Sequence, residues 1–136
     1  MTSVTKYFFD EVYAPSSGWS VVQWWEARRP IYNLAVGAAG LVSVTALTVS
    51  AALPPYPIRG GIPLLAVVVY GVLANLCYSA GPVADLLIRR RWGNQYAAVG
   101  PVLLRYGFAF AVGLTLLPVP LAALSWIARV VRLLFF

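Results

Sequence analysis

Five polar or charged side chains in the second half of the chain have types and spacings that could do chemistry in apolar surroundings: Asn75, Tyr78, Asp85, Arg89 and Arg105. Asp85 and Arg89 are four residues apart, the spacing at which a carboxylate and a guanidinium pair on a helix surface. Asn75 and Tyr78 continue the same helix face. Arg105, in the following segment, can snorkel or reach across to Asp85. The sequence therefore predicts a polar seam, the name used below for these five residues.

Three uses of the polar seam are open. An amide as deep in apolar sequence as Asn75 would lack partners in lipid, so we expect it to face another helix or a lined cavity. Hydrogen bonding between helices is the interpretation we favour. The alternatives are a pocket for an ion, a lipid headgroup or a small polar ligand, and a proton relay through Asp85. The relay has no second intramembrane carboxylate and no His to work with.

The chain lacks the residue types that most catalytic reactions require. There is no His, so no imidazole can serve a haem iron, a zinc ion or a catalytic triad. The sequence contains no P-loop, no dinucleotide fingerprint and no pair of carboxylates at a common depth. The single Cys cannot form an internal disulfide. We expect a protein that is not an enzyme, with no cofactor, no catalytic residue and no metal site.

Composition indicates the class of protein. Of 136 residues, 61% are hydrophobic and 10% are charged, and the mean hydropathy is +0.80. A soluble domain commonly has about a quarter of its residues charged. The formal net charge of +6 comes from arginines at the ends of hydrophobic segments, which favours membrane orientation over nucleic-acid binding. The predicted fold is an all-α integral membrane protein with one membrane domain over residues 1–136.

The apolar segments predict three spans. Residues 31–53 carry no charge and are long enough to cross a bilayer. "PPYPIRGG" ends this helix in a turn, and "LLPVP" breaks the chain again later. The last segment has Ser125, Arg129 and Arg132 on one face, as in an interfacial helix, with a fourth crossing as the alternative. The expected elements are an N-terminal interfacial segment (1–30), three spans (31–53, 62–88 and 101–117) and a C-terminal amphipathic helix or fourth crossing (121–136).

Two further patterns concern packing and anchoring. Small residues share one face of the first span and predict close helix packing: Ala35, Ala39, Ser43, Ala46 and Ser50. Ser20 is the expected N-cap of a short helix before this span. Indoles and guanidinium groups prefer the headgroup region, although the N-terminal indoles could instead pack on another subunit. The predicted interface anchors are Trp19, Trp24, Trp25, Arg28, Arg29, Arg90, Arg91, Trp92, Arg129 and Arg132.

The stretches "WWEARRPIYN" and "NLCYSAGPVADLL" carry a resemblance to a family of small uncharacterised bacterial multi-spanning inner-membrane proteins. The family shares an aromatic and basic approach to the first span and an Asn-x-x-Tyr in the second. The resemblance implies a bacterial inner-membrane location, but no activity and no functional residue.

Three functions are compatible with these patterns. The first is a non-catalytic accessory subunit of a larger respiratory, photosynthetic or transport complex. The alternative is a small oligomeric transporter or channel with Asn75, Tyr78 and Asp85 along its path, and the third is a protein that binds anionic lipid headgroups. The expected partners are the lipid bilayer, anionic headgroups, and other membrane subunits or further copies of the chain, without nucleic acid.

Arginine asymmetry predicts that the N-terminus is cytoplasmic. With three spans this orientation leaves three basic residues outside, Arg59, Arg129 and Arg132, and places seven inside: Lys6, Arg28, Arg29, Arg89, Arg90, Arg91 and Arg105. A fourth crossing would make the ratio nine to one.

A cysteine placed at Asn94 in a Cys77→Ala background tests this orientation. We expect an impermeant thiol reagent added from the periplasm to leave it unlabelled, because positively charged turns stay in the cytoplasm. A cysteine at Gly61 is the matched control and should be labelled. Periplasmic labelling at Asn94 would refute the orientation, and a cysteine added after Phe136 reports on the C-terminal end.

Overall fold

The computed structural model describes residues 17–55, 57–58, 60–93 and 99–135. Most of the predicted N-terminal segment (1–16) and part of the basic turn (94–98) lie outside the described residues. The described elements are five helices, with no strand among them: α2 (Gly18–Glu26), α3 (Arg29–Ala52), α4 (Leu64–Trp92), α5 (Val99–Leu116) and α6 (Pro118–Phe135). The prediction of an all-helical chain is confirmed for this part of the protein.

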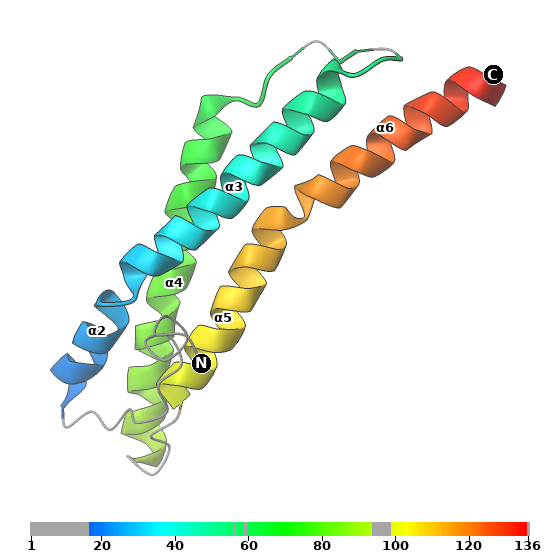
Figure 1. The fold of residues 1–136 in the computed structure, drawn as a ribbon. Coiled ribbons are helices and arrows are strands. Elements are labelled where there is room, and N and C mark those ends of the chain that lie inside the picture. The colour runs from blue at the N-terminus through cyan, green and yellow to red at the C-terminus, as the bar shows by residue number, and fades with distance from the viewer. Residues whose placement is uncertain (1–16, 56, 59, 94–98, 136) are drawn as a thin grey trace, which may run out of the picture.

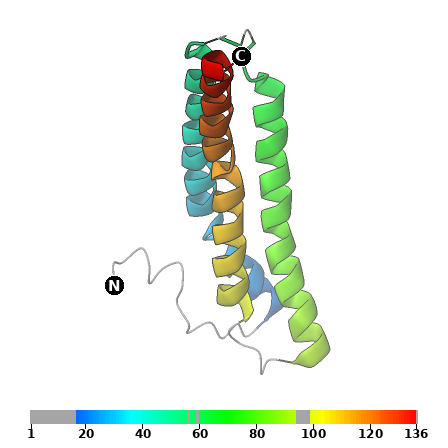
Figure 2. The ribbon, with the colours of Figure 1, turned by 90° about the vertical axis from the view of Figure 1, so that its right-hand side faces the viewer.

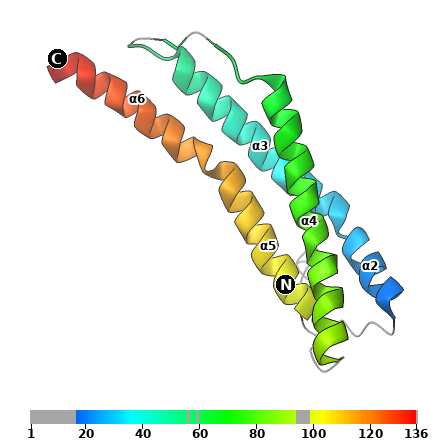
Figure 3. The same cartoon turned by 180° about the vertical axis from the view of Figure 1, so that it is seen from behind.

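The helices form three long rods (Figure 1). Three stretches are long and apolar enough to cross a membrane: Gly18–Ala52, Leu64–Trp92 and Val99–Phe135. The rods meet at the end where α2, the start of α3 and the C-terminus of α4 lie, which we call the arginine-rich end. Toward the opposite end α4 diverges from α3 and α6, which stay side by side (Figures 2 and 3).

For the alternative of a fourth crossing, the described residues provide no separate fourth span, because α6 continues in the direction of α5 and the two helices together form the third apolar stretch (Figure 1). Leu117 alone separates the two helices. Proline is well tolerated in the first turn of a helix, where its missing N–H would have no partner. Pro118 and Pro120 therefore break the hydrogen-bond ladder without providing a loop in which the chain could reverse.

Helix α3 packs lengthwise against α5 and α6 as a parallel pair, and α4 lies apart from them (Figure 2). The Ser50 hydroxyl donates to the Ala122 carbonyl at 2.8 Å, and the Trp126 indole donates to the Pro54 carbonyl at 2.9 Å. Both pairs are 72 residues apart, so the register is constant along the contact. Ala39 and Ser50 are buried. The packing face predicted from small residues is thus confirmed.

Donors from other parts of the chain bond to carbonyls at the ends of α5 and α3 that would otherwise lack partners. The last four carbonyls of a helix have no intrahelical partner. At the end of α5, the Thr115 carbonyl accepts from the buried Ser43 hydroxyl. At the end of α3, the Ser50 carbonyl accepts from the Arg129 guanidinium, and the Ala51 carbonyl accepts from the Ile58 backbone at 2.9 Å.

Arg129 therefore lies where the negative end of the α3 dipole favours a cation. The C-terminal turns of α6 run past the end of α3, with Arg132, Leu134 and Phe135 exposed. The prediction of Arg129 as a membrane anchor did not include this capping role.

The short helix α2 begins three residues earlier than predicted. Ser17 is its N-cap, and Ser20 occupies the third helical position of a capping box in which each side chain bonds to the other's backbone. Ser20 has the residue type of a cap, but a second serine upstream takes that position. Helix α3 starts directly afterwards with Pro30 in its first turn.

Helix α4 is continuous through Pro82, and its closest approach to α2 is at Gly81. A Cβ atom added to Gly81 would stand 2.6 Å from two carbons of the Trp25 ring. No side chain larger than hydrogen fits there without displacing the indole.

Gly81→Ala should therefore lower the free energy of unfolding by about 1–3 kcal/mol, the usual cost of overpacking a tight contact. Chemical denaturation in detergent, followed by tryptophan fluorescence, measures this. Gly113→Ala on α5 is the matched control, because a Cβ there meets nothing within 4 Å and alanine favours helix. Equal responses of the two variants would contradict the close contact.

Candidate functional site

The four α4 residues of the polar seam face the interior of the arginine-rich end, whereas Arg105 lies exposed on α5. Tyr78, Pro82 and Asp85 are buried, and Asn75 is half-buried. They lie on the side of α4 that meets α2 and the beginning of α3. The predicted shared face of α4 is confirmed at these positions.

Asp85 is the most enclosed charged side chain among the described residues, at 0% exposure. Its Oδ1 accepts from Arg89 Nε at 2.8 Å, and its Oδ2 accepts from Trp25 Nε1 at 3.1 Å. The Arg89 side chain is itself only 8% exposed. Each carboxylate oxygen thus has a donor, as a buried charge requires. The predicted pair of Asp85 with Arg89 is confirmed.

The predicted bridge from Arg105 to Asp85 is wrong. Among the described residues, the partners of Asp85 are Arg89 and Trp25, and Arg105 lies exposed on α5. The indole reaches the second carboxylate oxygen from α2 and closes the approach from solvent. Trp25 therefore takes the role that the sequence suggested for Arg105.

Three neighbours hold Trp25 in this position. Gly81 leaves room for its ring, and the Tyr78 hydroxyl donates to the Trp25 carbonyl at 2.6 Å. The rings of Trp25 and Tyr78 pack edge to face with centroids 5.6 Å apart. Tyr32 adds a second ring against Tyr78 at 4.5 Å. This aromatic cluster joins α2, α3 and α4.

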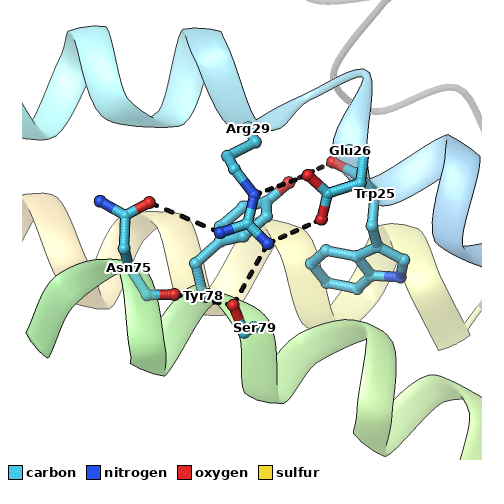
Figure 4. A network of polar contacts seen from close by, with 6 residues as sticks. All are labelled: Trp25, Glu26, Arg29, Asn75, Tyr78 and Ser79. Atoms are coloured by element: carbon cyan, nitrogen blue, oxygen red, sulfur yellow. Dashed lines mark hydrogen bonds and ion pairs between the residues drawn. The ribbon is translucent and has the colours of Figure 1, made fainter. Parts of the chain in front are cut away.

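A second polar network lies beside the first and is centred on Arg29 (Figure 4). Its Nε and Nη2 atoms donate to the two oxygens of Glu26 at 2.8 and 2.7 Å. Nη2 also donates to Ser79 Oγ at 3.2 Å, and Nη1 lies 3.5 Å from Asn75 Oδ1. The guanidinium thus ties the end of α2 and the start of α3 to α4.

The predicted interface anchors divide into three groups by burial, and Trp24, Arg29 and Arg129 form the half-buried group. Trp25 and Arg28 lie inside the bundle, at 2% and 7% exposure, which corrects their assignment as anchors. Arg28 stacks on the Trp24 ring, with Cζ 3.8 Å from the centroid, and donates to the Trp24 carbonyl. The exposed anchors are Trp19, Arg90, Arg91, Trp92 and Arg132. Their contact with headgroups stays a prediction.

Two cavities flank α4. A cleft of about 570 Å³ separates α3 from α4, and a smaller cavity of about 330 Å³ lies between α4 and α5. Two hydrogen bonds cross this region: Tyr32 Oη donates to the Ala74 carbonyl, and Tyr70 Oη pairs with Thr115 Oγ1. The cleft toward α3 begins at Asn75 and extends away from the arginine-rich end, whereas the cavity toward α5 also reaches Trp25, Tyr78 and Gly81 at that end.

The hydrogen bonds of Asp85 suit a structural contact between α2 and α4 better than a reactive centre. The Asp85 carboxylate is saturated with donors and closed to solvent. Within the described residues, no three His, Cys, Asp or Glu side chains gather in a way that could hold a metal ion.

No protein family, curated protein or solved structure was found to match this chain. The resemblance to small bacterial inner-membrane proteins therefore stays a prediction, and the function has to be argued from the geometry.

Sequence reasoning found the α4 side of the site and missed the α2 side. Trp25 was grouped with Trp19 and Trp24 because all three are indoles near a basic pair. The signal that could have separated it is Gly81, one turn before Asp85 on the polar face of α4. A glycine beside a buried carboxylate leaves room for a large ring that carries an N–H donor.

A double-mutant cycle tests which residue satisfies Asp85. Asp85→Ala should destabilise the protein by about 3 kcal/mol or more, because it leaves the guanidinium of Arg89 without its counter-charge. Combined with Trp25→Phe in unfolding measurements, it should give a coupling energy of about 1.5–3 kcal/mol, as for a hydrogen bond to a charged group.

The matched cycle pairs Asp85→Ala with Arg105→Gln. Its coupling energy should stay below about 0.5 kcal/mol, the range of additive sites. Strong coupling to Arg105 together with weak coupling to Trp25 would contradict the assignment.

Proposed function

We propose that this chain is a non-catalytic accessory subunit of a larger bacterial inner-membrane assembly, respiratory, photosynthetic or transport, with its N-terminus in the cytoplasm. The polar side chains that could do chemistry serve contacts within the chain. What the protein offers to its surroundings is mainly helix surface, which supports a role in holding partners together.

The observation that carries this proposal is a continuous apolar face on α4. It consists of side chains that are each more than half exposed: Leu65, Val72, Leu76, Val83 and Leu87. Leu65, Leu76 and Leu87 recur every eleven residues, a period that keeps them in one line along a helix. Because helix association in lipid depends on van der Waals packing, a span with few intramolecular contacts is the one best placed to accept another helix.

The exposed Arg90 and Arg91 favour a second candidate, a protein that binds anionic headgroups at the arginine-rich end. The transporter alternative is less well supported. It needs Asn75, Tyr78 and Asp85 along a solvated path, whereas Asp85 and Tyr78 are buried and bonded within the bundle.

Affinity purification in a mild detergent, followed by mass determination, tests the accessory role. We expect foreign membrane subunits in a fixed ratio to this chain. Val72→Trp should reduce their yield about tenfold, equivalent to ~1.4 kcal/mol, because the larger ring disturbs packing at the centre of the α4 face.

Val102→Trp on α5 is the matched control, since Val102 is also exposed, and it should leave the yield unchanged. Loss of partners with Val102→Trp alone would move the docking face to α5. A defined homo-oligomer without foreign chains would refute the proposal and favour the transporter.

A further inference from the structure

The cleft between α3 and α4 is not used by the docking face proposed above. Along α3 its lining runs from Asn33 to Leu47, and on the other side from Ile62, just before α4, to Asn75 within α4. Side chains of α5 close its floor. At Gly37 and Gly71 a Cβ atom would meet nothing within 4 Å, so both glycines border open space.

The shape of the cleft restricts what can occupy it. Asn33 to Leu47 spans about 21 Å at the rise of an α-helix, so a volume of about 570 Å³ gives a mean cross-section of about 27 Å². An α-helix with its side chains is about 10 Å wide or more and needs about 80 Å². A single hydrocarbon chain with carbon neighbours at about 4 Å needs only about 20 Å². The cleft is therefore too narrow for a helix and wide enough for one acyl chain.

The chemistry of the lining changes along the cleft. Its middle is apolar apart from Tyr70, Ser43 and Thr115, whose polar groups bond to one another across the helices. Asn33 and Asn75 lie at the arginine-rich end. A shallow groove continues from Asn75 to Arg29 and Ser79. Polar donors thus stand at one mouth of an apolar slot, which matches the headgroup and chain of a lipid.

The donors at this mouth indicate the kind of headgroup. Arg29 is 26% exposed along its side chain, and its charge is balanced by Glu26 at 2.7 Å. Glu26, Ser79 and the Asn75 Oδ1 atom accept from four of the five Arg29 N–H groups, and the Gly71 carbonyl accepts from one of the two Asn75 N–H groups. Within the described part of the chain, one N–H of each side chain is left to donate a directed hydrogen bond to a phosphate oxygen. Glu26 balances the positive charge of Arg29. We therefore expect this mouth of the cleft to bind the phosphodiester group that all phospholipids share, without a preference for headgroups that carry a net negative charge.

We propose that the α3–α4 cleft holds one acyl chain of a phospholipid whose phosphodiester lies at Arg29 and Asn75. The lipid fills the space that the divergence of α4 from α3 leaves open. The acyl-chain cleft shares no lining residue with the docking face of α4, whereas the groove toward Arg29 is bordered by Val72 and Leu76 of that face. Changes at Gly37 and Gly71 therefore test the lipid site separately from partner docking.

The purified protein in vesicles of phosphatidylethanolamine and phosphatidylglycerol allows a direct test. A trace of phosphatidylglycerol with a diazirine in its acyl chain is photolysed, and adducts are mapped by mass spectrometry. We expect adducts on cleft residues such as Leu41 and Val67 at higher density than on Val102, which reports ordinary surrounding lipid.

Filling the cleft should remove these adducts. The double change Gly37→Leu and Gly71→Leu is expected to lower cleft labelling about tenfold, equivalent to ~1.4 kcal/mol. Gly113→Leu is the matched control, because Gly113 also has open space around it but lies outside the cleft. If thermal unfolding shows that the double variant is not folded, the labelling of the single variant Gly71→Leu is measured instead. Unchanged labelling in the filled variant, or equal labelling of cleft and Val102, would overturn the site.

A second comparison tests the headgroup. Diacylglycerol with the same diazirine chain lacks the phosphodiester and should label the cleft about tenfold less than the phospholipid. Arg29→Gln should bring phospholipid labelling down to the diacylglycerol level. Phosphatidylethanolamine and phosphatidylglycerol probes should label alike. Equal labelling by diacylglycerol would overturn the assignment of the phosphate to Arg29 and Asn75.

Discussion

The burial of one carboxylate governs the arginine-rich end of this protein. Asp85 is removed from solvent, and a buried charge is tolerated only where donors replace its lost hydration. Arg89 supplies one donor from the same helix, but the second oxygen needs a group from elsewhere, and Trp25 provides it. This requirement places α2 across α4, demands a glycine at position 81, and brings Arg29 at the start of α3 within reach of α4.

The same requirement accounts for the uneven packing of the three rods. In lipid, apolar side chains gain little from meeting one another instead of lipid, so small residues and hydrogen bonds determine where helices touch. Helices α3 and α5–α6 have both along their whole contact, including the buried Ser43 and Ser50 hydroxyls. Helix α4 has them mainly near Asp85. Among the residues that the structure describes, the Tyr70 hydroxyl is the one polar side-chain group between Leu64 and Ala74 that reaches another helix. The open cleft follows from where the polar contacts end.

The sequence predicted features that depend on one helix at a time. The small residues of α3 and the Asp85–Arg89 pair follow from helical period alone, and the structure has both. Features that depend on two elements were harder to foresee. Nothing in residue type separates Trp25 from the other N-terminal indoles, and the role of Arg129 requires knowing that the end of α3 lies beside it. Likewise, two prolines predict a break but give no information about the direction in which the chain continues.

The distribution of polar contacts also constrains what the molecule can do. A carboxylate whose two oxygens both accept hydrogen bonds in a closed site is a poor base and a poor ligand, because any new partner would have to displace Trp25 or Arg89. The Asp85 carboxylate and the Trp25 indole, which join α2 to α4, are thus occupied by folding. The surfaces left for function are the apolar face of α4 and the slot between α3 and α4, one offering packing and the other a narrow channel with donors at its mouth. Both proposals for this chain accordingly depend on what its helices contact, a partner helix in one case and a lipid in the other.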